Sequence, residues 1–269
     1  MALGLYVEVE LEERAQGLLV EPEGEGAELP TGASHLAAQV ACKILGHDRV
    51  ALRVRSEIPV ARGLGSSAAL AVAAAAAAGV ELGSEGAFRC GAAFDGHAEN
   101  AAAAAFGGLV TATLVEDRPV ALPLPLDPAL GFVLVVPDNR LFTAAARDVL
   151  PEAVRYEDAV FNLGRLGLLV AGLADHTKLL AGAGDDRLHQ PARSALFPQA
   201  PALLEGLREA GALTSCWSGA GPSLLAITTR ASCPDVAEAA RQLMGRLRLA
   251  GRALELKADL EGVQVKQLA

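Results

Sequence analysis

The chain has 269 residues, of which 52 % are hydrophobic and 20 % are charged. This composition suits one large domain or two smaller ones with a buried core, and it excludes a disordered chain. The formal net charge of −9 argues against nucleic acids and anionic membranes as partners, because both are negatively charged. The four cysteines lack the spacing of a zinc site, so we expect reduced thiols in a cytoplasmic protein. The longest weakly polar run, 68–80, is too short to cross a bilayer, so no membrane segment is expected.

The amino-terminal half predicts a mixture of strands and helices. Apolar residues alternate with polar ones in two short segments, which is typical of half-buried strands. A stretch rich in glycine, proline and glutamate between them predicts a loop. The expected elements are a strand at 5–11, a loop at 21–32, a helix at 34–45, a strand at 50–54, helices at 68–78, 84–95 and 97–106, and a strand at 109–115.

The carboxy-terminal half predicts longer helices. Prolines between Pro119 and Pro128 indicate a connection, and the pattern changes near residue 138, where we place a domain boundary. Segment 157–173 carries its apolar residues on one stripe, as in an amphipathic helix. The expected elements are a strand at 132–136, helices at 157–173 and 201–210, a glycine-rich turn at 216–221, a strand at 224–228, a helix from 234, and short strands at 254–256 and 263–265. The chain is therefore of the α+β class.

The segment that joins the strand at 50–54 to the alanine-rich helix carries the strongest functional signal. Gly63 and Gly65 let the backbone turn sharply and come close to a ligand. Ser66 and Ser67 stand where the helix begins, and the first amides of a helix have no partners within it. Such amides, at the positive end of the helix dipole, can bind a phosphate. The alternative is an ordinary strand–turn–helix connection. No lysine follows the second glycine, so the segment is not a Walker loop.

This segment reads Pro-x-x-x-Gly-Leu-Gly-Ser-Ser-Ala-Ala and resembles the phosphate loop of the GHMP kinases. Further strings, in the same order along the chain, resemble the homoserine kinases of that superfamily. They lie at 95–109, 136–151, 158–163, 186–193 and 218–223. The resemblance implies a two-layer α+β GHMP-kinase fold. A nucleotide-binding domain would occupy residues 1–138, and a ferredoxin-like α+β domain would occupy residues 139–269.

The resemblance also implies the reaction and its cofactors. The expected substrates are ATP and L-homoserine, and the products are ADP and O-phospho-L-homoserine, a step in threonine biosynthesis. Mg²⁺ is the expected metal, with Ser66 and Asp95 as its protein ligands. A homodimer would be compatible with this family. The residues implied in nucleotide binding are Pro59, Gly63, Leu64, Gly65, Ser66, Ser67, Ala68 and Ala69.

Substrate and catalytic roles are implied for residues in the other strings. His97 and Asn100 are three residues apart, can share one helical face, and correspond to family positions near the substrate hydroxyl. Arg193 joins them as a catalytic candidate. Guanidinium groups suit bidentate pairing with a carboxylate, so Arg147 and Arg193 are expected to hold the substrate carboxylate. The residues implied in substrate binding are Asn100, Thr143, Arg147, Arg193, Gly219 and Gly221. No general base is assigned.

The chain departs from the family pattern at several points. Homoserine kinases open with a strand and a PATSANLGPGFD-type loop, whereas this chain begins with a string that resembles a later family segment. We therefore expect the amino-terminal substrate segment to be missing. Asp95 stands where the family has glutamate, and Glu99 stands where it has aspartate. Two alternatives stay open: another GHMP kinase acting on a mevalonate-type or sugar-type alcohol, and a nucleotide-binding protein without catalytic activity. The predicted arginine pair favours an acceptor with a carboxylate.

Overall fold

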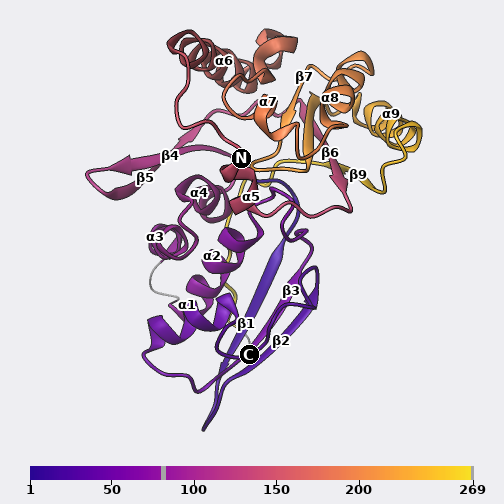
Figure 1. The fold of residues 1–269 in the computed structure, drawn as a ribbon. Helices are drawn as coiled ribbons and strands as arrows, with labels where there is room; N and C mark the ends of the chain where they lie inside the picture. The colour runs from indigo at the N-terminus through magenta and orange to yellow at the C-terminus, as the bar shows by residue number, and fades with distance from the viewer. Residues whose placement is uncertain (80–82, 268–269) are drawn as a thin grey trace. The chain divides into compact units, whose positions relative to one another are not determined.

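A computed structural model describes residues 1–79 and 83–267 (Figure 1). The chain forms two compact units. Unit 1 comprises residues 1–60, 65–124 and 258–269, and unit 2 comprises residues 61–64 and 125–257. The segment between Val60 and Gly65 thus belongs to unit 2, although the chain on both sides of it belongs to unit 1. The sequence-based boundary at residue 138 remains a prediction about domains.

Unit 1 contains a three-stranded sheet in the order β1-β3-β2. Strand β1 (Val7–Glu13) is antiparallel to β3 (Val50–Ser56), whereas β2 (Leu19–Gly24) is parallel to it. The sequence predicted a loop where β2 ends. Pro22 can lie within this strand because β2 is at the edge of the sheet, where no donor is needed on the outer side.

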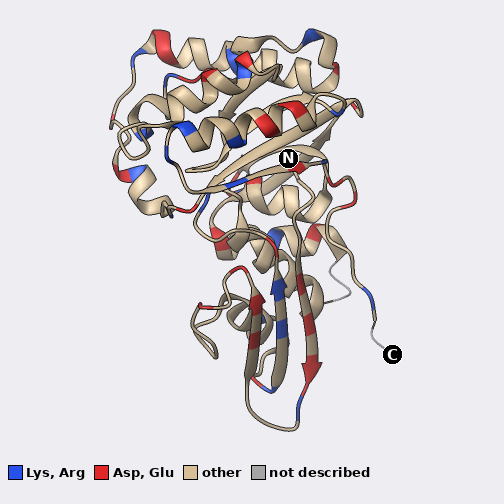
Figure 2. Cartoon of the chain, turned by 90° about the vertical axis from the view of Figure 1, so that its right-hand side faces the viewer, with Lys and Arg blue, Asp and Glu red and all other residues tan. Residues whose placement is uncertain are grey.

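The solvent face of this sheet carries alternating charges. Arg53 lies between Glu10 and Glu21, and Arg55 lies between Glu10 and Glu23, with nitrogen–oxygen distances of 3.0–3.5 Å. In Figure 2 the basic residues of β3 are flanked by acidic residues of β1 and β2. Opposite charges on neighbouring strands stabilise the pairing, so the alternation read in the sequence fixes which face meets water.

Helices cover the other face of this sheet (Figure 1). They are α1 (Leu36–Leu45), α2 (Ser66–Ala78), α3 (Gly83–Asp95) and α4 (Ala98–Phe106). The alanines of α2 allow close helix packing, and a Cβ on Gly91 of α3 would lie 2.5 Å from a Val72 methyl group. The hairpin β4 (Leu109–Val115) and β5 (Arg118–Leu124) follows, and β5 replaces part of the predicted proline-rich connection.

Unit 2 contains a four-stranded antiparallel sheet in the order β7-β8-β6-β9. The strands are β6 (Leu130–Pro137), β7 (Thr214–Trp217), β8 (Leu224–Thr229) and β9 (Gly251–Leu256). Every residue of β6 is buried, as expected for a central strand. Helices α8 (Ala200–Glu209) and α9 (Cys233–Arg246) pack on this sheet and form its hydrophobic core. The predicted strand at 263–265 is absent from the described structure.

The remaining helices of unit 2 are α5 (Thr143–Asp148), α6 (Tyr156–Ala174) and α7 (Gln190–Arg193). Two 3₁₀ turns, η2 (His176–Lys178) and η3 (Ala181–Gly184), connect α6 to α7. The apolar stripe of α6 is largely exposed, since Leu163 and Leu166 are 70 % and 57 % accessible. None of the described helices combines the length and the apolar character that a membrane crossing requires.

Candidate active site

The first half of the glycine loop is held by unit 2. The Arg62 side chain donates from Nε to the Pro137 carbonyl at 2.7 Å and from Nη2 to the Asp138 carbonyl at 2.5 Å, at the end of β6. The Ser218 hydroxyl donates to the Gly63 carbonyl at 2.9 Å. Gly63 has φ +71°, and a Cβ there would lie 2.1 Å from the Ser218 carbonyl oxygen. Only glycine fits at this position, for both conformational and steric reasons.

The second half of the loop begins helix α2 in unit 1. The N-cap residue is Gly65 with φ +67°, and a glycine has no side chain that could cap the first turn of α2. The amides at Ser66, Ser67 and Ala68 precede the first bond of the helix, which Ala69 donates to the Gly65 carbonyl at 3.0 Å. A Cβ on Gly65 would lie 3.3 Å from the side chain of Asn100, so glycine also leaves room for that residue.

Asp95 lies beside the first turn of α2. The Ser67 hydroxyl donates to its Oδ1, and His97 Nδ1 lies 2.9 Å from its Oδ2 and 2.9 Å from its carbonyl oxygen. The Asp95 side chain is only 6 % accessible. The sequence paired Asp95 with Ser66, whereas the contact observed is with Ser67. Unit 1 thus brings Asp95, His97, Asn100 and the start of α2 together.

Arg193 occupies the carboxy end of α7 in unit 2. Its Nη1 donates to the Gly219 carbonyl at 3.1 Å, and its Nε donates to the Ala146 carbonyl of α5 at 3.3 Å. Burial lowers the pKa of the Arg193 guanidinium; the Asp186 carboxylate acts in the opposite direction, and the charge of Arg147 lowers this pKa further. Arg147 is therefore close enough for its charge to be felt, and Thr143 begins the same short helix.

The loop between β7 and β8 contains both glycines that the sequence singled out. Gly219 has φ +52° and Gly221 has φ +81°. A Cβ on Gly219 would lie 2.9 Å from the Gly63 carbonyl oxygen, and one on Gly221 would lie 2.3 Å from the Trp217 ring. The loop that contains Arg62 and Gly63 and the loop from Ser218 to Gly221 therefore interlock without space for a methyl group.

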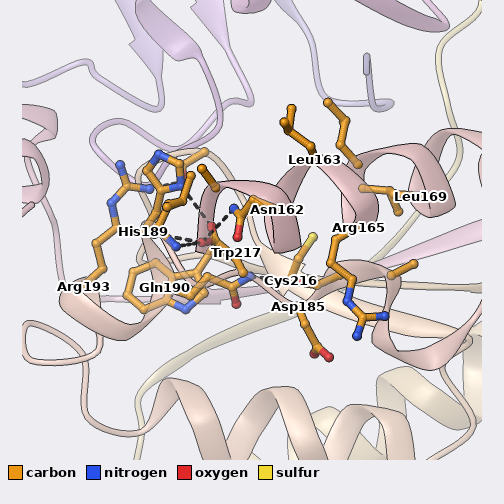
Figure 3. A pocket seen from close by; sticks show the side chains of 17 residues that line it. Asn162, Leu163, Arg165, Leu169, Asp185, His189, Gln190, Arg193, Cys216 and Trp217 are labelled. Carbon is orange, nitrogen blue, oxygen red and sulfur yellow. Dashed lines mark hydrogen bonds and ion pairs between the residues drawn. The ribbon is translucent and has the colours of Figure 1, made fainter. Parts of the chain in front are cut away.

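A cavity of about 610 Å³ lies in unit 2 between α6, α7, η3 and β7. In Figure 3 the side chains of Arg193 and His189 lie at one end, and Leu163 and Leu169 of α6 lie at the other. The exposed stripe of α6 thus lines a cavity instead of packing on a core. Burial raises the pKa of the Cys216 thiol to about 11, so this residue contributes an uncharged wall.

Sequence reasoning missed some of the residues that organise these groups. Arg62 falls on an unspecified position of the loop pattern, and Ser218 lies in one of the family strings without an implied role. Their contacts join segments up to 155 residues apart, so local pattern could not reveal them. The sequence offered one clue to these two residues: each is a polar residue next to a glycine in a glycine-rich loop.

Comparison with known proteins identifies the family. The model of the GHMP kinases N terminal domain matches residues 32–108, and that of the GHMP kinases C terminal domain matches residues 169–246. A homoserine kinase of Mycolicibacterium vanbaalenii is 40 % identical over 259 residues, which cover 90 % of this chain and 82 % of the relative. A homoserine kinase of Thermus thermophilus is 43 % identical over 235 residues, covering 84 % of this chain and 80 % of the relative.

Solved structures agree with this result. The crystal structure of homoserine kinase from Cytophaga hutchinsonii aligns with a TM-score of 0.83 and 25 % identity, covering 94 % of this chain and 86 % of that one. A mevalonate kinase of L. major shares the fold, with a TM-score of 0.71 and 16 % identity. The α+β class and the resemblance read from the sequence are confirmed, and use of ATP follows from a kinase family. The chain belongs to the homoserine kinase family of the GHMP kinases.

Proposed function

We propose that this protein transfers the γ-phosphate of ATP to the hydroxyl of L-homoserine, giving ADP and O-phospho-L-homoserine for threonine biosynthesis. Family membership supports the reaction, since the relatives named above are homoserine kinases. The structural observation that carries the proposal is the start of α2, where Gly65 leaves the first-turn amides without a capping side chain. Such amides, aided by the helix dipole, bind the phosphates of a nucleotide.

Magnesium fits the group around Asp95. The Asp95 carboxylate and the Ser67 hydroxyl adjoin each other beside α2, and Mg²⁺ prefers such oxygen ligands together with phosphate oxygens and water. We assign Asp95 and Ser67 to this ion, and Ser66 at the first position of α2 stays a predicted ligand. When bound, Mg²⁺ would offset the negative charge of the phosphates.

The substrate hydroxyl is assigned to His97 and Asn100. The Asp95 carboxylate accepts a hydrogen bond from His97 Nδ1, which holds the imidazole ring in one orientation. Asn100 lies against Gly65, next to the amides proposed for the phosphates. Phosphoryl transfer depends mainly on positioning and charge stabilisation, so these two residues orient the acceptor and no general base is required.

The substrate carboxylate is assigned to Arg193 and Arg147. Arg193 is partly buried, and the two carbonyls of Ala146 and Gly219 fix its guanidinium plane. The Arg147 charge, felt at Arg193, adds a second cation. Two arginines together favour a carboxylate ligand, which distinguishes an amino-acid acceptor from a sugar.

The test uses the purified chain with Mg²⁺ and ATP. L-Homoserine should yield ADP and an equal amount of phosphohomoserine, detected by a coupled assay and by ³¹P NMR, whereas 3-amino-1-propanol, which lacks the carboxylate, should react poorly. Arg193→Ala should raise the KM for homoserine at least tenfold and the KM for ATP by less than about twofold. ATP binding without turnover on any acceptor would instead indicate a nucleotide-binding protein without catalytic activity. Equal effects of Arg193→Ala on both KM values would refute the carboxylate role.

A further inference from the structure

The turn that leads into α7 is organised by one carboxylate. Asp186 Oδ1 accepts hydrogen bonds from the Leu188 amide, from the His189 amide at 2.8 Å and from Asn162 Nδ2 at 3.2 Å. Asp186 Oδ2 lies 2.9 Å from His189 Nδ1, which must carry the proton because an ionised carboxylate only accepts. Figure 3 shows these bonds converging beneath His189.

Asn162 ties this turn to α6. Its side-chain Nδ2 donates to Asp186 Oδ1, and its side-chain Oδ1 accepts from the Arg187 backbone amide at 2.9 Å. Both halves of the Asn162 amide are therefore used on the same turn. Gln190 adds a third connection, since its Nε2 donates to the Gly184 carbonyl at 2.8 Å. The position of the turn is thus set by α6 and η3.

The position of Arg193 depends on this turn. Its backbone amide donates to the His189 carbonyl at 3.0 Å, and His189 is the residue that Asp186 holds through both its amide and its ring. Burial acts to raise the pKa of Asp186, but hydrogen bonds from His189, Asn162 and Leu188 outweigh it, so the net pKa is lowered and the carboxylate stays ionised. Its charge also opposes the loss of charge at Arg193.

We propose that Asp186, supported by Asn162, is a positioning residue that sets Arg193 for the substrate carboxylate. The inference rests on the proposed function, in which Arg193 binds that carboxylate. In this role Asp186 acts through the turn, to which both of its oxygens are hydrogen-bonded. Replacing it by asparagine removes the charge and places an N–H₂ group where either His189 or the backbone amides need an acceptor. The turn then shifts, and the guanidinium of Arg193 shifts with it.

The experiment is a double-mutant cycle read as homoserine KM, and as the calorimetric Kd of L-homoserine, which requires no turnover. Asp186→Asn should raise the KM and the Kd for homoserine about tenfold, while kcat and the KM for ATP change less than about twofold. In the Arg193→Ala background the same substitution should have no further effect, because residues that act through one another are not additive. Asn162→Ala, which leaves the carboxylate in place, should give a smaller selective loss and serves if Asp186→Asn fails to fold.

The matched control is Asp175→Asn. Asp175 is a carboxylate of unit 2 that accepts a hydrogen bond from the Thr177 amide at 3.1 Å at the start of η2, so Asp175→Asn reproduces the loss of such a charge at another turn. It should lower the unfolding temperature without changing homoserine binding. The positioning role would be overturned if Asp186→Asn raised the homoserine Kd by the same factor in the native and the Arg193→Ala backgrounds. It would also be overturned if Asp186→Asn raised the KM for ATP as much as the KM for homoserine. If Arg193→Ala alone leaves homoserine binding unchanged, the carboxylate assignment falls and the inference falls with it. If Arg193→Ala weakens binding and Asp186→Asn does not, the inference alone falls.

Discussion

At the scale of single residues, Gly63 combines two constraints that can be separated. A side chain there meets a left-handed backbone and the Ser218 carbonyl at 2.1 Å. Gly46 has a similar φ of +75°, but a Cβ there would have nothing within 4 Å, so it carries the first constraint alone. We expect Gly63→Ala to lower ATP affinity at least tenfold, because the loop must move away from Ser218. Gly46→Ala should cost about 1 kcal/mol of stability and leave ATP affinity unchanged in calorimetry.

Asp95 gives a second prediction at this scale. The Asp95→Asn substitution keeps the size of the side chain and removes the charge that favours a divalent cation. We expect the Mg²⁺ concentration for half-maximal activity to rise about tenfold at saturating ATP and homoserine. Titration of activity with Mg²⁺ measures the shift. An unchanged Mg²⁺ requirement would remove Asp95 from the proposed metal site.

The residues that sequence could identify are those whose chemistry is local. Gly63 and Gly65 were predicted because a turn before a helix requires them wherever it occurs. The serine that contacts Asp95 was not predicted correctly. Ser66 and Ser67 point in different directions from the first turn of α2, and the packing of α3 on α2 determines that Ser67 is the one in contact. Arg62 was missed for the same reason, because its acceptors lie 75 and 76 residues away.

At the scale of elements, α6 contains glycines of two kinds. A Cβ on Gly164 or Gly167 would have nothing within 4 Å, whereas one on Gly172 would lie 2.4 Å from a Leu179 methyl group and 2.6 Å from Leu179 Cα. Alanine favours a helix interior over glycine by roughly 0.5–1 kcal/mol. We expect Gly164→Ala and Gly167→Ala each to stabilise unit 2 by about that amount in chemical denaturation. Gly172→Ala should destabilise it, and a gain there would contradict the observed packing.

A second prediction at this scale concerns Asp127, which lies just before β6 and contacts η2. Asp127 accepts hydrogen bonds from the amides of His176 and Ala129 and from the His176 ring, which lower its pKa from 3.8 to about 2. A carboxylate with a depressed pKa in the folded state stabilises the fold above its unfolded pKa, and this stabilisation is lost as pH falls through the folded value. Between about pH 4 and pH 2 the chain should therefore lose stability through Asp127.

The check compares the free energy of unfolding across that pH range in the native chain and in Asp127→Asn. The variant should be less stable at pH 6 and should show a shallower decline between pH 4 and pH 2. Asp117→Asn, at the turn between β4 and β5, is the control for removing a carboxylate elsewhere in the chain. Parallel curves for the native chain and Asp127→Asn would show that His176 and Ala129 do not depress this pKa.

Sequence pattern succeeded for elements with a clear period and failed for the edge strand β2. The strands predicted at 5–11 and 50–54 alternate cleanly and are present as β1 at 7–13 and β3 at 50–56. Strand β2 was missed because only Val20 of its six residues is fully buried, and its glutamates resemble a loop until Arg53 and Arg55 are placed beside them. The amphipathic pattern of α6 predicted the helix, but not that its apolar face would border a cavity.

At the scale of the whole molecule, the residues proposed for the site come from both units of the chain. Unit 1 contains the start of α2, Asp95, His97 and Asn100, and unit 2 contains the arginines and the loop from Ser218 to Gly221. Residues 61–64 belong to unit 2 although they lead directly into α2. The family strings are spread over both units, so the sequence alone was enough to identify the family. The contacts of the glycine loop could not be derived from sequence, because they join segments that are far apart along the chain.

The final prediction follows from linkage between ligand binding and folding. A ligand that binds only the native state stabilises it by RT ln(1 + [L]/Kd), which is about 2.7 kcal/mol at a hundredfold excess over Kd. A non-hydrolysable ATP analogue with Mg²⁺ should therefore raise the midpoint of guanidinium unfolding, followed by far-UV circular dichroism. Gly63→Ala should reduce this stabilisation to about half or less at the same analogue concentration, because an affinity at least tenfold weaker leaves at most RT ln(1 + 10), about 1.4 kcal/mol. Asp186→Asn should retain the full rise because its effect is confined to the homoserine carboxylate. An undiminished nucleotide-dependent shift in Gly63→Ala would show that the triphosphate binds elsewhere, and the assignment of the α2 amino terminus would fail.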